Sequence, residues 1–210
     1  KLNWTGRLVA VQPRIRLTRS FDERYRSYLG YVLLVDGRRD ETVEEFLVAV
    51  GEAAHTRHAF QAGMEVRGVS VPVENPQKET AAYYKTSGIK ILRPAASPPG
   101  ESPPPGPPFL GIPPSLKAYR ARGHRRLAAR TYSTKCYACI WGSRMAVEMI
   151  IDQWNPAQKK YRFETFCYGP KSCAFYRSGP ERVVPGRKGM SWTEEDWVDE
   201  DATAHREEDE

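Results

Sequence analysis

The sequence lacks any long apolar run. None of its hydrophobic stretches approaches the roughly 20 consecutive apolar residues that a membrane-spanning helix needs, charged residues make up 28 % of the chain, and the mean hydropathy is −0.62. A transmembrane protein is therefore excluded, and we expect no membrane partner. The N-terminal segment also lacks the basic and then apolar pattern of a secretory signal. The sequence thus predicts a cytoplasmic protein. Because it begins at Lys1 rather than Met, removal of a preceding segment is the alternative.

Known catalytic motifs are also missing. The chain contains no P-loop, no Gly-rich dinucleotide fingerprint, no Gly-x-Ser-x-Gly elbow and no His-Glu-x-x-His zinc motif. Its four histidines are scattered, and its carboxylates are concentrated near the C-terminus. We therefore expect a protein that is not an enzyme. The alternative is an enzyme whose site is completed by a partner chain.

Charges of the two signs are unevenly distributed. The chain carries 32 Lys and Arg against 26 Asp and Glu, a formal net charge of +6. Residues 194–210 contain ten acidic residues and one arginine, a net charge of −9 that leaves +15 on the remainder. A strongly basic body favours a polyanionic partner, of which nucleic acid is the simplest. A well-solvated basic surface with no specific partner is the alternative.

A proline-rich segment divides the chain. Ten of the 21 residues from Pro94 to Pro114 are proline and three are glycine. Proline lacks the backbone donor that a helix or a sheet needs, and such segments form extended, semi-rigid spacers. A ligand for an SH3-type groove is the alternative. The sequence therefore predicts a first domain over 1–93, a linker over 94–114, a second domain over 115–193 and an acidic tail over 194–210.

Short apolar or alternating runs follow one another through the first 93 residues. This pattern is typical of strands. An Ala-rich, helix-compatible segment at 53–61 interrupts the series, and Gly63 closes it. We expect five strands, within residues 5–17, 28–35, 45–50, 65–73 and 89–92.

This order of elements resembles an OB-fold barrel, with five strands and a short helix between the third and the fourth. The run Ala62-Gly63-Met64-Glu65-Val66-Arg67-Gly68 is similar to the start of the fourth strand in many OB domains. There one glycine precedes the strand and another relieves crowding where the strand curls. The resemblance covers roughly 90 residues and implies a small barrel in a mainly β protein. An SH3-like barrel is the alternative.

The resemblance also implies a binding surface. OB-fold barrels often bind single-stranded nucleic acid through a basic groove and aromatic platforms for stacked bases, although they also bind sugars and proteins. Arginine and aromatic residues, Phe21 among them, are interleaved in this part of the sequence. The alternative is a barrel rim and a solvated strand face. The candidate binding residues are Arg14, Arg16, Arg24, Tyr25 and Tyr28.

All four cysteines fall within 38 residues of the second domain. Cys136 and Cys139 are two residues apart, a spacing that lets both thiolates reach one tetrahedral ion. The following segment alternates over 145–154, turns at 155–158 and alternates again over 160–166, as a hairpin does. Such a hairpin brings Cys167 back to the first pair, and Cys173 follows after a turn-prone loop.

This arrangement resembles a zinc ribbon, in which Cys136 and Cys139 form the first knuckle and Cys167 and Cys173 the second. It departs from the ribbon pattern because the second pair is separated by five residues rather than two to four. The resemblance implies a structural Zn²⁺, because four thiolates leave no open position for a reacting water. The alternatives are disulfides, a thioredoxin-like redox pair and an iron–sulfur cluster.

The most basic stretch lies just before the first cysteine. Residues 117–135 hold seven cations and no acid. Such a stretch can engage several phosphates, with an affinity that falls as salt rises. A basic linker without a ligand is the alternative. Candidate phosphate contacts are Arg120, Arg122, Arg125, Arg126 and Arg130, and Lys171 adds one near the second cysteine pair.

The tail has the opposite sign and contains two tryptophans, Trp192 and Trp197, near its start. A disordered acidic end is the ordinary interpretation. A sharper hypothesis is that the tail docks on the basic surface and competes with nucleic acid. In that case, deletion of residues 194–210 tightens binding at low salt.

These features together predict a non-enzymatic protein that binds single-stranded or structured nucleic acid, RNA or DNA, as an accessory subunit of a larger complex. A protein–protein adaptor, whose OB-like and zinc modules dock partner proteins, is the alternative. Salt dependence separates the two, because phosphate contacts weaken steeply with salt and an apolar interface does not.

Overall fold

A computed structural model of the chain describes residues 1–20, 24–96 and 106–207. The protein is mainly β. Its strands are β1 (Leu2–Arg19), β2 (Arg24–Arg39), β3 (Thr42–Val50), β4 (Glu65–Pro72), β5 (Tyr83–Arg93), β6 (Arg125–Arg126), β7 (Gly142–Ile150), β8 (Lys159–Cys167), β9 (Arg182–Pro185) and β10 (Ser191–Glu194). The α-helices are α1 (Glu52–His58), α2 (Leu116–Arg122), α3 (Ala129–Thr131) and α4 (Asp196–Thr203), and short helical turns are η1 (Pro76–Lys78), η2 (Tyr132–Cys136) and η3 (Arg187–Gly189). None of the described helices is long and apolar enough to cross a membrane.

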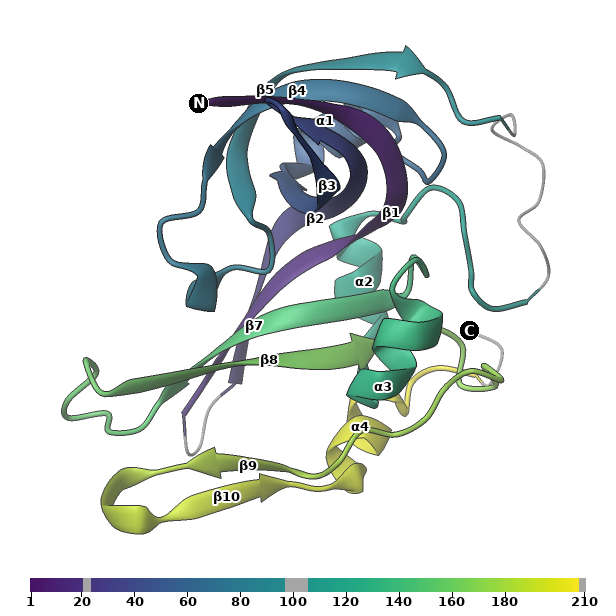
Figure 1. Cartoon of the computed structure of the whole chain (residues 1–210). Helices are drawn as coiled ribbons and strands as arrows, with labels where there is room; N and C mark the ends of the chain where they lie inside the picture. The colour runs from purple at the N-terminus through teal and green to yellow at the C-terminus, as the bar shows by residue number, and fades with distance from the viewer. Residues whose placement is uncertain (21–23, 97–105, 208–210) are drawn as a thin grey trace.

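The first five strands close into a ring (Figure 1). β1 pairs with β2, β2 with β3, β3 with β5, β5 with β4, and β4 again with β1. The expected five strands and the helix between the third and the fourth are therefore confirmed. The largest difference at a single strand end is the start of β5, which lies at Tyr83 rather than Ile89. The sequence did not predict the first half of this strand because it shows no clean alternation of apolar and polar residues.

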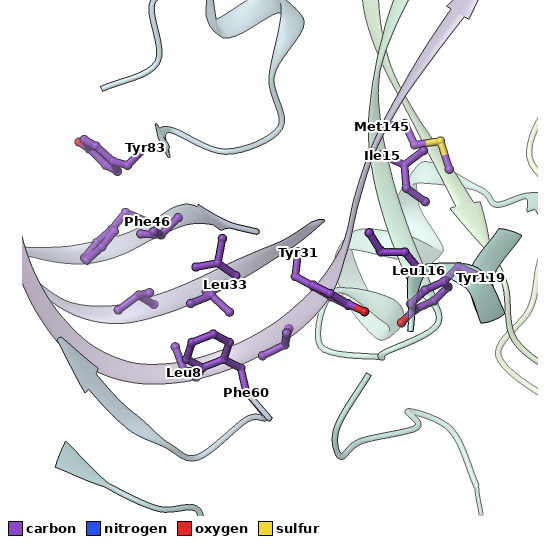
Figure 2. Close-up of a cluster of buried hydrophobic side chains, with 14 of the residues drawn as sticks. Leu8, Ile15, Tyr31, Leu33, Phe46, Phe60, Tyr83, Leu116, Tyr119 and Met145 are labelled. Atoms are coloured by element: carbon purple, nitrogen blue, oxygen red, sulfur yellow. The ribbon is translucent and has the colours of Figure 1, made fainter. Parts of the chain in front are cut away.

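Large apolar side chains fill the inside of the ring (Figure 2). Leu8, Leu33, Phe46 and Phe60 are each at most 5 % exposed. Phe60 enters the ring from the segment after α1, where Ala59 takes a left-handed conformation that ends the helix. The alternation of apolar and polar residues along the strands thus defines the core face, as period-2 patterning requires.

The ring and the cysteine region share one sheet. β1 is 18 residues long, and its distal end pairs in parallel with β7 from Arg16↔Ala146 to Arg19↔Met149. β7 and β8 form the hairpin that the sequence predicts, with Gly142 opposite Cys167. The two regions expected as separate domains are therefore joined in an eight-stranded mixed sheet.

Helix α2 fills the junction between the ring and the second region. Leu116 and Tyr119 are buried beside Tyr31 of β2 (Figure 2). The Tyr31 hydroxyl donates to the Pro114 carbonyl at 2.7 Å, and the Tyr119 hydroxyl donates to the Ile140 carbonyl at 2.5 Å. The C-terminal end of the proline-rich segment is thus anchored on the ring, whereas residues 97–105 lie outside the described residues.

The acidic C-terminal segment folds onto the body through β10 and α4 (Figure 1). Glu194 is 2 % exposed and pairs with Arg19 and Arg24. Asp199 is also buried and pairs with Arg126. The expectation of a disordered end is therefore wrong for residues 194–207, because buried arginines of the body need these carboxylates as partners.

Candidate nucleic-acid interface and cysteine pocket

The four cysteines lie on two turns and at the end of strand β8. Cys136 ends η2, and the Cys139 amide donates to its carbonyl at 3.0 Å, which makes the first pair a tight turn. The β7–β8 register then places Cys167 beside this turn. Cys173 follows in a second turn, in which the Cys173 amide donates to the Pro170 carbonyl at 3.2 Å.

All four cysteines line one small enclosed pocket. Its volume is about 10 Å³, room for about one water-sized occupant. Cys136, Cys139 and Cys167 are buried, Cys173 is half-buried, and all four are free thiols. The remaining wall is mainly apolar and comes from Pro107, Pro108, Phe109, Leu127, Trp141, Gly142, Gly169, Phe175 and Tyr176.

The chemistry of this pocket suits a thiophilic cation. Burial, together with repulsion from the neighbouring thiolates, raises the pKa of Cys136 to about 12 and that of Cys139 to about 11. The thiols are therefore neutral unless a cation stabilises the thiolates. The Gly169 amide already donates to the Cys167 sulfur at 3.3 Å. The sulfurs surround the pocket without converging, since no group of three or more Cys, His, Asp or Glu in the described parts of the chain has metal-site spacing.

A second site is a groove between the start of β2, helix α2 and the end of α4. We call it the Arg–Tyr groove. Its volume is about 380 Å³, and no carboxylate lines it among the described residues. Tyr25 is 69 % exposed on its surface, and the Arg120 guanidinium lies 4.9 Å from the ring centre of Tyr28. The groove is lined by Arg24, Tyr25, Arg26, Tyr28, Arg120, Ala121, Gly123, His124, Ala202 and His205.

The groove brings together four of the residues that the sequence singles out: Arg24, Tyr25, Tyr28 and Arg120. They come from two segments, the start of β2 and helix α2, that are separated in the sequence by the later strands of the ring and the linker. Arg26 also lines it and belongs to the same interleaved series of arginines and tyrosines in the sequence. His124, from the basic stretch, and His205, from the acidic segment, line it as well, and only folding brings these two together.

The other predicted contacts lie elsewhere. Arg14 pairs with buried Glu79, and Arg16 donates to the Lys78 carbonyl at 3.0 Å. Arg122 donates to the Tyr168 carbonyl at 2.8 Å. Three more belong to the surroundings of the cysteine region: Arg125 donates to the Pro170 carbonyl at 3.0 Å, Lys171 donates to the Arg206 carbonyl at 2.7 Å, and Arg130 is exposed on α3. Phe21 lies outside the described residues.

Arg126 is an interior residue. Its side chain is 0 % exposed, and its guanidinium donates to Asp199 at 2.9 Å, to the Glu194 carbonyl at 2.9 Å and to Asp196. A charge held in this way cannot reach a phosphate on the surface. We therefore assign Arg126 to the fold rather than to a binding interface.

His124, at the base of the Arg–Tyr groove, makes stability depend on pH. The ring is 3 % exposed and lies 3.2 Å from the Tyr168 hydroxyl. Burial, together with repulsion from nearby arginines such as Arg26 and Arg19, holds its pKa well below 6.5. The unfolded chain therefore binds a proton below about pH 6.5 that the folded chain does not bind, so stability falls as the pH falls.

We expect the free energy of unfolding to decrease by about 1.4 kcal/mol between pH 7.5 and 5.5 through His124 alone. His55, whose pKa burial also lowers, changes stability in the same direction. Denaturant titrations at the two pH values measure this decrease in the free energy of unfolding. It should be smaller by about 1.4 kcal/mol in His124→Asn than in the unmodified protein. An equal drop in both proteins would contradict a neutral, buried His124.

Comparison with protein-family models, with curated proteins and with solved structures gives no match for this chain.

Proposed function

We propose that this protein is a non-catalytic nucleic-acid-binding protein and that the Arg–Tyr groove binds a single strand of RNA or DNA. One observation carries the proposal. Three arginines and two tyrosines from distant parts of the chain line one groove that contains no carboxylate among the described residues. A positive groove with aromatic platforms is the general means of binding single strands without sequence preference.

The tyrosines and the arginines of the groove would contact different parts of a bound strand. Tyr25 is exposed and offers a face on which a base can stack. Arg120 is also exposed and offers donors to a phosphate. Arg24 forms an ion pair with Glu194 at 2.9 Å, so its side chain is less free to move toward a ligand in the groove. Stacking contributes to affinity with any base, and the arginines make the affinity fall as salt rises.

The proposal includes two modules that support the groove. The five-stranded ring acts as an OB-like barrel, and its strand order β1-β2-β3-β5-β4 with α1 between β3 and β4 favours this assignment. The region from β6 to Cys173 acts as a zinc-ribbon-like module that holds one structural Zn²⁺ through its four cysteines. The shared pocket and the donor set favour this assignment. As an accessory subunit, the protein would present the bound strand to a larger complex.

The test is a binding titration of the full chain with labelled single-stranded RNA, single-stranded DNA and duplex DNA across a range of salt concentrations. Tyr25→Ala should weaken single-strand binding about 5- to 150-fold, since stacking contributes about 1–3 kcal/mol per base. Arg120→Glu should weaken binding and reduce its salt dependence.

Two control variants match these changes in chemistry but not in place. Trp154→Ala removes an aromatic residue that is 83 % exposed at the β7–β8 turn, and Arg130→Glu reverses an exposed charge on α3. Both should bind nearly as the unmodified protein does. Equal losses in all four variants would place binding outside the groove. A folded protein that binds no nucleic acid at low salt would support the adaptor instead.

A further inference from the structure

β1, β4 and β5 lie side by side near the N-terminus (Figure 1), and their pairing with one another and with β2 aligns a row of exposed cations. Lys90 of β5 lies opposite Arg67 of β4, Arg67 lies opposite Thr5 of β1, and Thr5 lies opposite Arg38 of β2. All four side chains are exposed. We call Lys90, Arg67 and Arg38 the cationic row.

The three cations of the row are not held in ion pairs within the part of the chain that the structure describes. Among the residues that the structure describes, no carboxylate forms an ion pair with Lys90, Arg67 or Arg38. The same pair of strands shows the ordinary arrangement nearby. There, Glu65 lies opposite Arg93, and the two side chains pair at 3.1 Å.

An unbalanced row of this kind works against folding. Side chains directly opposite each other on neighbouring strands lie close together, and like charges in such positions destabilise a sheet. Arg67 and Lys90 occupy such positions. A polar residue at either position would remove the repulsion. An external anion that lies across the row would relieve this repulsion.

The row lies along a groove that can admit such an anion. The groove has a volume of about 430 Å³, and Asp40 is the one carboxylate among its described lining residues. The Gly88 backbone is open to the outside, with no atom within 4 Å of where a side chain would begin. Trp4, the aromatic residue of the groove, is 3 % exposed and cannot stack on a base.

We infer that the cationic row binds consecutive phosphates of an anionic polymer. Lack of an exposed aromatic surface in the groove favours phosphate contacts over base contacts. The identification of the polymer as nucleic acid rests on the proposed function, whereas phosphate binding by the row does not. The groove along the row and the Arg–Tyr groove share no lining residue, so the row is a second contact point, distinct from the Arg–Tyr groove.

The experiment compares the full chain with an Arg67→Gln/Lys90→Gln variant in titrations with a labelled oligo(dT) of 20 nucleotides. Loss of two phosphate contacts should reduce the slope of log affinity against log salt by about 1.4. The affinity lost between 50 and 200 mM salt should then be smaller by about sevenfold. Arg93→Gln, which removes a paired cation from the same strand, should leave the slope unchanged. An unchanged slope in the double variant would overturn the inference and leave the proposed function standing.

Thermal unfolding provides a readout that does not depend on nucleic acid. Without ligand, Lys90→Gln should raise the unfolding midpoint by about 1–3 °C, because it removes the repulsion from Arg67. Inorganic tripolyphosphate should raise the midpoint of the unmodified protein and have a smaller effect on the double variant. If neither oligo(dT) nor single-stranded RNA binds but tripolyphosphate acts in this way, the proposed function fails and the row stands. If tripolyphosphate affects both proteins equally, the row does not bind phosphate.

Discussion

Asp199→Ala is expected to lower the free energy of unfolding by about 3–5 kcal/mol, because it leaves a buried arginine without its main counter-ion. Arg126 is fully buried. Asp199 accepts from its Nε at 2.9 Å and from its backbone amide at 3.0 Å. Equilibrium denaturation in urea measures the change, and the amplitude of the transition shows whether the variant folds at all.

The matched control is Asp196→Ala. Asp196 also pairs with the Arg126 guanidinium, but its own side chain is 75 % exposed. Removal of an exposed partner of this kind changes stability by about 0–1 kcal/mol. Asp199→Asn should fall between the two alanine variants, since an amide keeps an acceptor but not the charge. A similar, small effect of Asp199→Ala and Asp196→Ala would contradict the importance of the buried pair.

The same contacts change the expected result of removing the tail. Residues 194–207 supply carboxylate partners to Arg19, Arg24 and Arg126, and Arg19 has a further partner in Glu164. Deletion of residues 194–210 would therefore expose or strand these arginines and destabilise the fold, rather than simply free a basic surface for nucleic acid. Point variants in the exposed part of α4, such as Glu200→Gln, test competition by the tail without removing buried charge.

The second large effect concerns the cysteine pocket. We expect the purified protein to contain about one zinc per chain and to lose its cooperative thermal transition when a strong chelator removes the metal. Structural zinc contributes about 10–16 kcal/mol of apparent binding free energy in small modules, at or above the upper part of the range of about 5–15 kcal/mol for the stability of a folded protein. Elemental analysis and unfolding curves with and without chelator measure both quantities.

Substitution of single cysteines tests the same site. Cys139→Ser and Cys173→Ser should each lower the zinc content and the unfolding midpoint, because each removes one of four ligands. Ala174→Ser, a change at the exposed neighbour of Cys173, should change neither. Bound iron with visible absorption would indicate an iron–sulfur cluster. A metal-free, stable protein in which Cys173→Ser has no effect would assign the cysteines to the core alone.

Local sequence patterns were enough to predict the strands and the hairpin of the fold. The alternation over 145–154 and 160–166 predicted the β7–β8 hairpin, and the short runs before residue 93 predicted the five strands of the ring. The cysteine spacing likewise predicted that Cys167 returns to Cys136 and Cys139, and the β7–β8 register places Gly142, just after that pair, opposite Cys167. These inferences succeed because strand periodicity and turn chemistry depend on neighbours in sequence.

The charges show the limit of such patterns. In the sequence, Arg120, Arg126 and Arg130 belong to one basic stretch and are equivalent. The fold sends Arg120 to the Arg–Tyr groove, buries Arg126 against Asp199 and leaves Arg130 exposed on α3. Whether a charge meets a ligand or an internal partner is decided by burial and by distant segments, and neither is encoded in the local spacing.

The sequence by itself thus determined the strands, the turns, the clustering of the cysteines and the basic character of the body, because each follows from residues close together in the chain. Only the tertiary structure decided the parallel pairing of β1 with β7, the docking of the acidic segment and the lining of the two grooves. The alignment of Lys90, Arg67 and Arg38 depends on the register of four strands. Register is a long-range property, since a shift of one residue turns every side chain to the other face of the sheet.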